Sequence, residues 1–140
     1  MASVIHLFRA PKKRLPMEPL YEATLVRDFG IAGCSHARAG SKRQVLLIDT
    51  ETLEAMDLKP GMIRENITTD GLDVNGLMIG QKLRVGGASL VVSAICTPCN
   101  LLEKIRPGLR REIWGRRGML CRVIGGGIVR CCDPIVKLTD

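Results

Sequence analysis

The stretch QKLRVGGASLVVSAI, residues 81–95, has the pattern of a β-hairpin. A short strand-like run precedes Gly86-Gly87 and a longer, more apolar run follows it, and a glycine pair supplies the backbone freedom of a tight turn. The second arm is rich in Val, Leu and Ile, which favours a buried strand. We therefore expect an antiparallel sheet built around this hairpin.

Further short strands are predicted on both sides of the hairpin. The tail MLCRVIGGGIVRCCDPIVKL, residues 119–138, predicts two or three strands joined at residues 125–127. In MIRENITT, residues 62–69, strand alternation would place Arg64 and Asn66 on one face. The remaining strand candidates are residues 3–8, 22–28 and 44–49.

Three short helices complete the expected fold. Thr50 can cap a helix over residues 51–58, and a second helix is expected just after Cys99, where Asn100 and Glu103 have the spacing of a capping box. The third covers residues 109–114. Many short strands, few helices and 15 glycines indicate a mainly β, barrel-like fold in a single domain over residues 1–140.

Composition limits the classes of partner. A net charge of +7 and a pI of about 9.4 favour phosphate ligands, nucleic acid or acidic proteins. Aromatic residues make up only 3% of the chain, which disfavours nucleic acid because single-stranded nucleic acids bind on aromatic platforms. No apolar run approaches the roughly 20 residues of a membrane span, and the N-terminus lacks the order of a signal peptide. We expect a cytoplasmic protein with its six cysteines as thiols.

The CxxC at Cys96 and Cys99 is the clearest chemical motif, and it leaves several sites open. A redox pair of the thioredoxin type would need a surrounding βαβ pattern, which is not predicted here. A zinc site could be assembled from Cys34, His36, Cys96 and Cys99. For Cys96 alone, the simplest interpretation is an apolar residue at the end of a strand.

Cys99 differs because it precedes a predicted helix and a dense set of arginines. The helix N-terminus and the positive charge would both favour its thiolate, the form that binds soft metals or carries sulfur. Arginine forks suit phosphate, and glycines between them let a backbone approach a ligand. The arginines in question are Arg110, Arg111, Arg116 and Arg117. They could equally form a solvated surface.

Five stretches together resemble the MOSC domain, the module named for the C-terminal part of molybdenum-cofactor sulfurase. The resemblance runs from about Glu22 to Leu138 and is of the free-standing bacterial type. Its parts, in chain order, are GIAGCSHARAGSKRQVLLID, KPGMIRENITTDGLDV, LMIGQKLRVGGASLVV, TPCNLL and GRRGMLCRVIGGGIVRCCDPIVKL.

The resemblance implies a β-barrel fold related to the pyruvate-kinase β-barrel domain, together with a link to the molybdenum cofactor (molybdopterin). The family is associated with molybdenum binding and sulfur transfer, and some members reduce N-hydroxylated compounds. Partners implied are the pterin cofactor and a cysteine desulfurase or molybdoenzyme. Pyridoxal phosphate is an association of the family only, because this chain has no room for the separate domain that binds it.

The resemblance also implies site residues. Cys99 matches the family's Pro-Cys cysteine, taken as the metal ligand or sulfur carrier, while Arg64 and Asn66 match its Arg-Glu-Asn-Ile segment. His36 matches a histidine of the glycine-rich loop. Relatives usually have Gly-Asp where this chain has Gly-Cys34, so a second thiol could lie in the site. The alternative to a cofactor protein is a non-enzymatic anion- or nucleic-acid-binding module.

Among the six thiols, we expect Cys99 to be modified first by a limiting alkylating reagent near neutral pH, because reactivity follows thiolate character and access. Cys121, within the apolar run MLCRVIG, should be inert. Mass mapping of the alkylated peptides measures the order. If Cys34 reacts first while Cys99 stays unmodified, the role assigned to Cys99 moves to the GCSHARAG loop.

Overall fold

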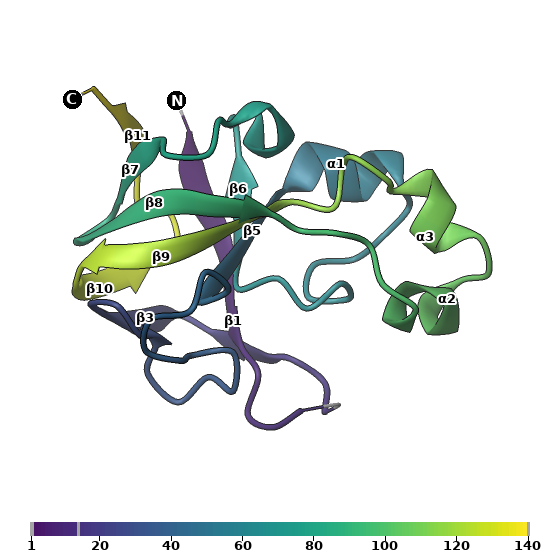
Figure 1. Cartoon of the computed structure of the whole chain (residues 1–140), viewed down its shortest axis with the longest axis horizontal. Helices are drawn as coiled ribbons and strands as arrows, with labels where there is room; N and C mark the ends of the chain where they lie inside the picture. The colour runs from purple at the N-terminus through teal and green to yellow at the C-terminus, as the bar shows by residue number, and fades with distance from the viewer. Residues whose placement is uncertain (1, 14, 140) are drawn as a thin grey trace.

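The structure is a computed structural model that describes residues 2–13 and 15–139 (Figure 1). Its larger sheet has eight strands in the order β11-β7-β8-β9-β5-β6-β1-β2, and the smaller one has three in the order β10-β3-β4. The strands are β1 (Ser3–Arg9), β2 (Glu18–Leu20), β3 (Glu22–Val26), β4 (Gly30–Ile31), β5 (Val45–Asp49), β6 (Ile67–Asp70), β7 (Lys82–Val85), β8 (Ala88–Ile95), β9 (Met119–Gly125), β10 (Gly127–Arg130) and β11 (Ile135–Leu138). The helices are α1 (Thr50–Ala55), α2 (Leu101–Ile105), α3 (Leu109–Glu112) and the 3-10 turn η1 (Val74–Gly76).

The predicted hairpin is confirmed and supplies the second and third strands of the larger sheet. β7 and β8 are antiparallel, with Val85 opposite Ala88 across the glycine turn. β8 also pairs with β9 along most of its length, so it has neighbours on both sides. The predicted mainly β, barrel-like fold is therefore correct, although within the described residues neither sheet closes on itself.

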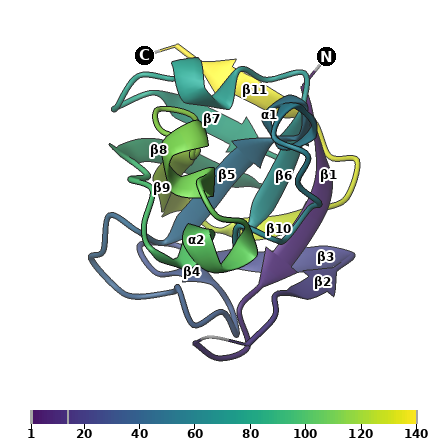
Figure 2. The same cartoon turned by 90° about the vertical axis from the view of Figure 1, so that its right-hand side faces the viewer.

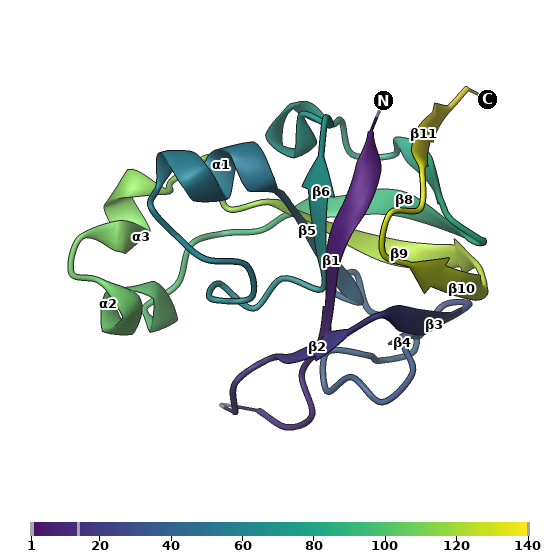
Figure 3. The same cartoon turned by 180° about the vertical axis from the view of Figure 1, so that it is seen from behind.

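The tail supplies three strands, as predicted, and connects the two sheets. After β9 the chain turns at Gly126, and β10 pairs with β3 of the smaller sheet. The turn passes very close to the larger sheet. A Cβ atom added at Gly127 would overlap the carbonyl oxygen of Gly87. The principal core lies where the two sheets meet and is aliphatic, with Val4, Leu47 and Leu90 fully buried in it. Figure 3 shows β1 in front of this core and both termini at one edge.

The three helices gather at one end of the molecule, which faces the viewer in Figure 2. A second core joins them to the sheet, because Ile48 of β5 packs with Leu53 of α1 and with Leu102 of α2 and Ile113 beyond α3. α1 also links β5 to β6, and these two strands are parallel, with Leu47 opposite Ile67. No helix among the described residues is long and apolar enough to cross a membrane.

Two helix caps differ from the prediction. α1 is capped by Asp49, whose Oδ2 accepts hydrogen bonds from the backbone and side chain of Thr52, and not by Thr50. α2 begins as expected after Asn100, but the capping box is not formed. Glu103 instead accepts hydrogen bonds from the amides of Gly108 (3.0 Å) and Arg110 (3.0 Å), so it caps α3.

The predicted strand over residues 62–69 is wrong in its first half. Residues 59–64 form turns, with the amide of Arg64 bonded to the carbonyl of Gly61 at 3.1 Å, and β6 begins only at Ile67. Arg64 has a left-handed backbone (φ 66°), which ends the alternation expected of a strand. Arg64 and Asn66 therefore do not share a strand face.

Gly118 should be the most sensitive glycine at the end where the helices lie. Its φ of +103° is unfavourable for other residues, and a Cβ there would overlap the carbonyl oxygen of Leu47. We expect Gly118→Ala to lower the free energy of unfolding by about 3 kcal/mol or more, measured by urea denaturation. Gly115→Ala is the matched control, because its φ is +81° with nothing within 4 Å, and it should cost about 1 kcal/mol. Equal losses would contradict the steric account.

Candidate functional site

A cavity of ≈ 530 Å³ lies between α2 and the loop that precedes β5. This volume falls in the range of roughly 300–1,000 Å³ that is typical of small-molecule sites. Several loops and strand ends contribute to it, which explains why its residues are scattered along the sequence. The lining residues are Lys13, Ser35, His36, Ala37, Arg38, Ser41, Arg43, Leu46, Arg64, Cys96, Cys99, Leu101, Arg117 and Leu120.

The apolar part of the cavity comes from three adjacent strands. Leu46 of β5, Leu120 of β9 and Cys96 at the end of β8 pack together as a small buried cluster. Leu46 and Leu120 are direct cross-strand partners. Cys96 is 4% exposed, which confirms its interpretation as an apolar residue, although it borders the cavity and not the principal core.

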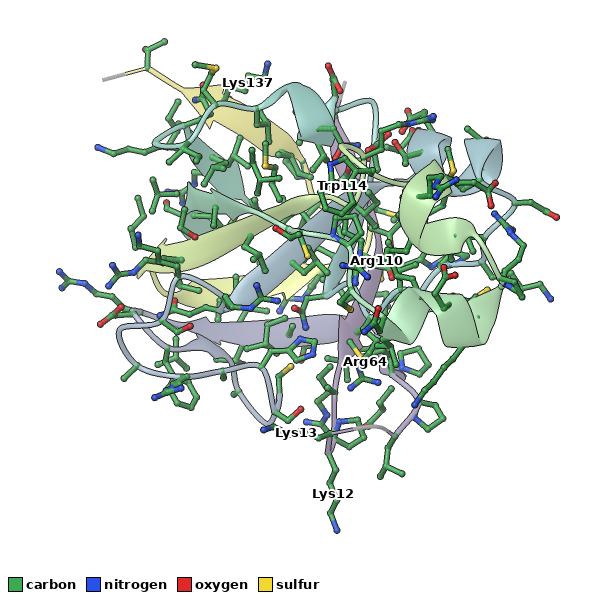
Figure 4. The ribbon with its side chains drawn as sticks, turned by 45° about the vertical axis from the view of Figure 1, so that its right-hand side comes forward. Lys12, Lys13, Arg64, Arg110, Trp114 and Lys137 are labelled. Carbon is green, nitrogen blue, oxygen red and sulfur yellow. The ribbon has the colours of Figure 1, made fainter. Side chains whose placement is uncertain are left out.

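The polar part of the cavity is strongly basic. Four lysine or arginine side chains from three loops line it, and a fifth, Arg117, precedes β9. None of the described lining residues is acidic. Figure 4 shows two of these cations, with Arg64 beside the helical end and Lys13 below Arg64 in this view. A second hollow of ≈ 580 Å³ shares Lys13, His36 and Arg64 with the first and adds Lys104, so the basic region extends past a single small pocket.

Arg117 is the most unusual of these cations because it is buried. Its side chain is 5% exposed, and its Nη2 donates to the carbonyl oxygen of Ile63 at 2.7 Å. Nε and Nη1 are buried without a hydrogen-bond partner in the described structure. Such donors are costly to leave unsatisfied, and the charge of Arg117 interacts with the buried carboxyl of Glu65.

Arg64 is held at the cavity by its own backbone and by a contact with a distant loop. The left-handed conformation turns the chain sharply, and Nη1 donates to the carbonyl oxygen of Leu15 at 2.6 Å. This bond joins the loop after β1 to the loop before β6. The remaining guanidinium donors can serve a ligand, because arginine carries five N–H groups in a planar fork.

Cys99 is an exposed thiol on the cavity wall, one residue before the N-cap of α2. The helix has only five residues, so its dipole contributes little, and the positive surroundings come mainly from the cavity cations. The position suits a side chain that must reach a ligand. The composite zinc site is not formed, since no three His, Cys, Asp or Glu side chains in the described chain are grouped to hold a metal.

His36 also lines the cavity, and Asn66 fixes it from beneath. The two side chains are joined by a 3.3 Å contact between His36 Nδ1 and Asn66 Oδ1. Asn66 is fully buried, and its Oδ1 also accepts the amide of Leu46 at 2.9 Å. Its Nδ2 donates to the carbonyl of Phe8 at 3.2 Å. Asn66 is thus a positioning residue and does not line the cavity.

Cys34 belongs to the same hydrogen-bonded group. Its Sγ accepts the amide of Ala10 at 3.3 Å and Nδ2 of Asn66 at 3.4 Å. Burial raises the pKa of the Cys34 thiol, but hydrogen bonds from the His36 side chain and the Ala10 amide outweigh it and lower the pKa from 9.0 to about 7. The thiol therefore ionises near neutral pH.

Three of the predicted arginines lie elsewhere. Arg110 and Arg111 border a separate hollow of ≈ 560 Å³ together with Trp114, and Arg116 is exposed. The guanidinium of Arg110 is turned to Asn100, with a hydrogen bond of 2.8 Å to its Oδ1. Figure 4 shows Arg110 and Trp114 on the helical side, above Arg64.

Sequence reasoning missed three cations of the cavity, Lys13, Arg38 and Arg43. They lie in the loops 10–17 and 32–44, whose basic residues resemble an ordinary solvated surface. Their places in the chain give a signal. The loop 10–17 follows β1, which pairs with β6, and the loop 32–44 leads into β5.

Comparison with known proteins agrees with this geometry. The MOSC domain model matches residues 35–136. Among solved structures, the YuaD protein of Bacillus subtilis has a TM-score of 0.80 at 20% identity, covering 96% of this chain and 94% of that one. YiiM of Geobacillus stearothermophilus has 0.82 at 18%, covering 99% and 76%. YiiM of Escherichia coli has 0.73 at 21%, covering 100% and 71%. The comparison with curated proteins gives no match.

The buried Glu65 beside Arg117 should give the stability a distinctive pH dependence. Burial raises the pKa of this carboxyl above 4.5, against hydrogen bonds from Gly61 and Thr68 and the charge of Arg117. The folded state therefore holds the proton more tightly than the unfolded state, and stability falls as pH rises from the ordinary glutamate range through the raised pKa.

We expect Glu65→Gln to remove this pH-dependent contribution to the free energy of unfolding. Wild type should therefore lose stability relative to the variant as pH rises from about 4 to 7. Urea denaturation at several pH values measures the difference. Parallel stability curves for the two proteins would contradict the assigned ionisation.

Proposed function

From the premise that the chain belongs to the MOSC domain family, we propose that its basic cavity binds a phosphorylated molybdenum–pterin cofactor and that the protein acts in sulfur transfer or in reduction of N-hydroxylated substrates. The observation that carries the proposal is the buried Arg117, whose Nε and Nη1 lack partners at a cavity wall that also holds the exposed thiol of Cys99. The family's association with molybdenum-cofactor sulfurase supports the same ligand class.

The residues present fit such a cofactor. A phosphate requires several N–H donors in a partly desolvated place, which Arg117 and Arg64 provide, and long-range attraction comes from the other cavity cations. A soft metal requires a thiolate, which the exposed Cys99 can supply. When bound, the cofactor would supply a metal centre able to accept electrons or sulfur.

The remaining roles fall to His36 and Asn66. His36 lies at the cavity wall, where its imidazole can donate or accept a hydrogen bond to a ligand. Asn66 holds the ring in place through the contact with Nδ1 and is itself held by three further hydrogen bonds. A cysteine desulfurase or a molybdoenzyme is the partner class we propose for sulfur delivery or receipt.

We expect the protein to copurify with molybdenum and pterin from a host that makes the cofactor, measured by elemental analysis and by pterin fluorescence after denaturation. Arg117→Gln and Arg64→Gln should each lower cofactor retention about tenfold, the loss expected for charge-assisted hydrogen bonds. Cys99→Ser should lose molybdenum more than pterin.

Arg111→Gln is the matched control, because Arg111 is exposed and borders the separate hollow. It should retain the cofactor as wild type does. Wild type free of molybdenum and pterin would overturn the proposal. Binding of nucleic acid that weakens steeply with salt and survives Cys99→Ser would favour the anion-binding module instead.

A further inference from the structure

Cys34, His36 and Asn66 form a connected polar group directly beneath the cavity. Asn66 contacts His36 through Oδ1 and Cys34 through Nδ2, so one amide orients both the imidazole and the thiol. The His36 side chain also favours the ionised form of Cys34, which helps to lower the pKa of that thiol. A thiol, an imidazole and an orienting amide are the components of an activated sulfur nucleophile.

Comparison with Cys121 shows that this is not the ordinary environment of a buried thiol. Cys121 is fully buried, and burial alone raises its pKa to about 12. Cys34 is also buried, at 7% exposure, but it accepts two N–H groups. Cys34 therefore differs from Cys121 in being slightly more exposed and in having N–H donors that stabilise a negative sulfur.

Two basic side chains, Arg9 and His36, interact with Cys34, and Arg9 is itself paired with a carboxylate. Arg9 of β1 lies close enough to Cys34 for their charges to interact, and it pairs with Glu18 at 3.1 Å. On the other side, Ser35 and His36 belong to the wall of the basic cavity. A small anion attracted into the cavity would therefore approach Cys34 from the side of His36.

We propose that Cys34, which lies behind the cavity wall next to the lining residues Ser35 and His36, is a second reactive thiol. It takes one sulfur atom from a small anionic sulfane-sulfur donor, with His36 as its base and Asn66 as the residue that positions both. The inference deepens the sulfur-carrying part of the proposed function and rests on it for its biological meaning. Its chemistry is tested on the protein without cofactor.

The step balances without an external oxidant. The thiol proton moves to His36, and the Cys34 thiolate attacks the protonated sulfur of a hydrogen disulfide anion, HS–S⁻. The S–S bond of the donor breaks as the new bond to Cys34 Sγ forms. The product is a neutral Cys34 persulfide, Cys–S–SH, and the departing sulfide takes the proton from His36 and leaves as hydrosulfide. Cys34 is regenerated when the outer sulfur passes to a further acceptor thiolate, which becomes the new persulfide.

The limited exposure of Cys34 selects the size of the donor. Bulky reagents should meet the exposed Cys99 first, whereas a two-atom anion needs only a narrow approach. The cavity cations raise the local concentration of such an anion. The two thiols thus have different expected reagents.

The test treats the purified protein with limiting inorganic polysulfide at pH 7 without oxygen, followed by alkylation in denaturant and peptide mapping. Trypsin places Cys34 in DFGIAGCSHAR and Cys121 in GMLCR, so the buried control lies on a separate peptide. We expect the Cys34 peptide to carry one added sulfur at least about tenfold more often than the Cys121 peptide, and still to do so in Cys99→Ser.

A variant of the base His36 adds a pH-dependent rate, which a purely structural role of His36 would not change. His36→Gln should lower the rate of sulfur addition at Cys34 about tenfold or more at pH 7, because the thiol returns toward its ordinary pKa, and this deficit should shrink near pH 9. Circular dichroism melting confirms that the variant is folded.

Three results would overturn the inference: addition at Cys34 no greater than at Cys121, loss of addition at Cys34 in Cys99→Ser, or an unchanged rate and pH profile in His36→Gln. All are read without molybdenum. A failure here is therefore distinct from a failure to copurify with the cofactor, which would overturn the proposed function and leave the reactivity of Cys34 as measured.

Discussion

The buried amide of Asn66 is the contact on which the arrangement of this site depends. Three segments that are distant in sequence meet at this side chain: Phe8 of β1, Leu46 of β5, and both Cys34 and His36 of the glycine-rich loop. The side-chain amide of Asn66 can form hydrogen bonds with all of these residues because it carries both acceptor and donor atoms on one rigid plane. An apolar replacement of Asn66 would leave several buried polar groups unpaired and would therefore destabilise both the loop and the sheet.

Much of the fold follows from local sequence. The glycine pair of 81–95 and the glycine run of 119–138 mark tight turns, and the apolar runs between them can be buried only as strands. Residues 62–66 could not be predicted in the same way. Their alternation is that of a strand, but Glu65 is buried to accept the amide of Gly61 and the hydroxyl of Thr68, which requires a turn. Tertiary hydrogen bonds thus override the local pattern.

The site was predictable where a motif stays on one short segment. Cys99, His36 and Arg64 all line the cavity, as the family resemblance implied. The arginine run was harder, because Arg110, Arg111 and Arg117 look alike in sequence and differ only in what surrounds them. The carboxylate of Glu103 holds the start of α3 so that Arg110 turns to Asn100, whereas Gly118 brings Arg117 against the sheet. Such differences arise from packing, which spacing does not encode.

Cys34 shows how one residue can alter a site without altering its scaffold. At a position where the family resemblance implies a carboxylate, a thiolate can still accept the amide of Ala10 and the side-chain N–H of Asn66. The hydrogen bonds that would orient an anion are therefore preserved, while the anion itself becomes a nucleophile. A carboxylate in this place could only orient His36, whereas a thiolate can also form a bond to sulfur. The same network thus supports either a positioning role or a reactive one, and the identity of this single side chain decides between them.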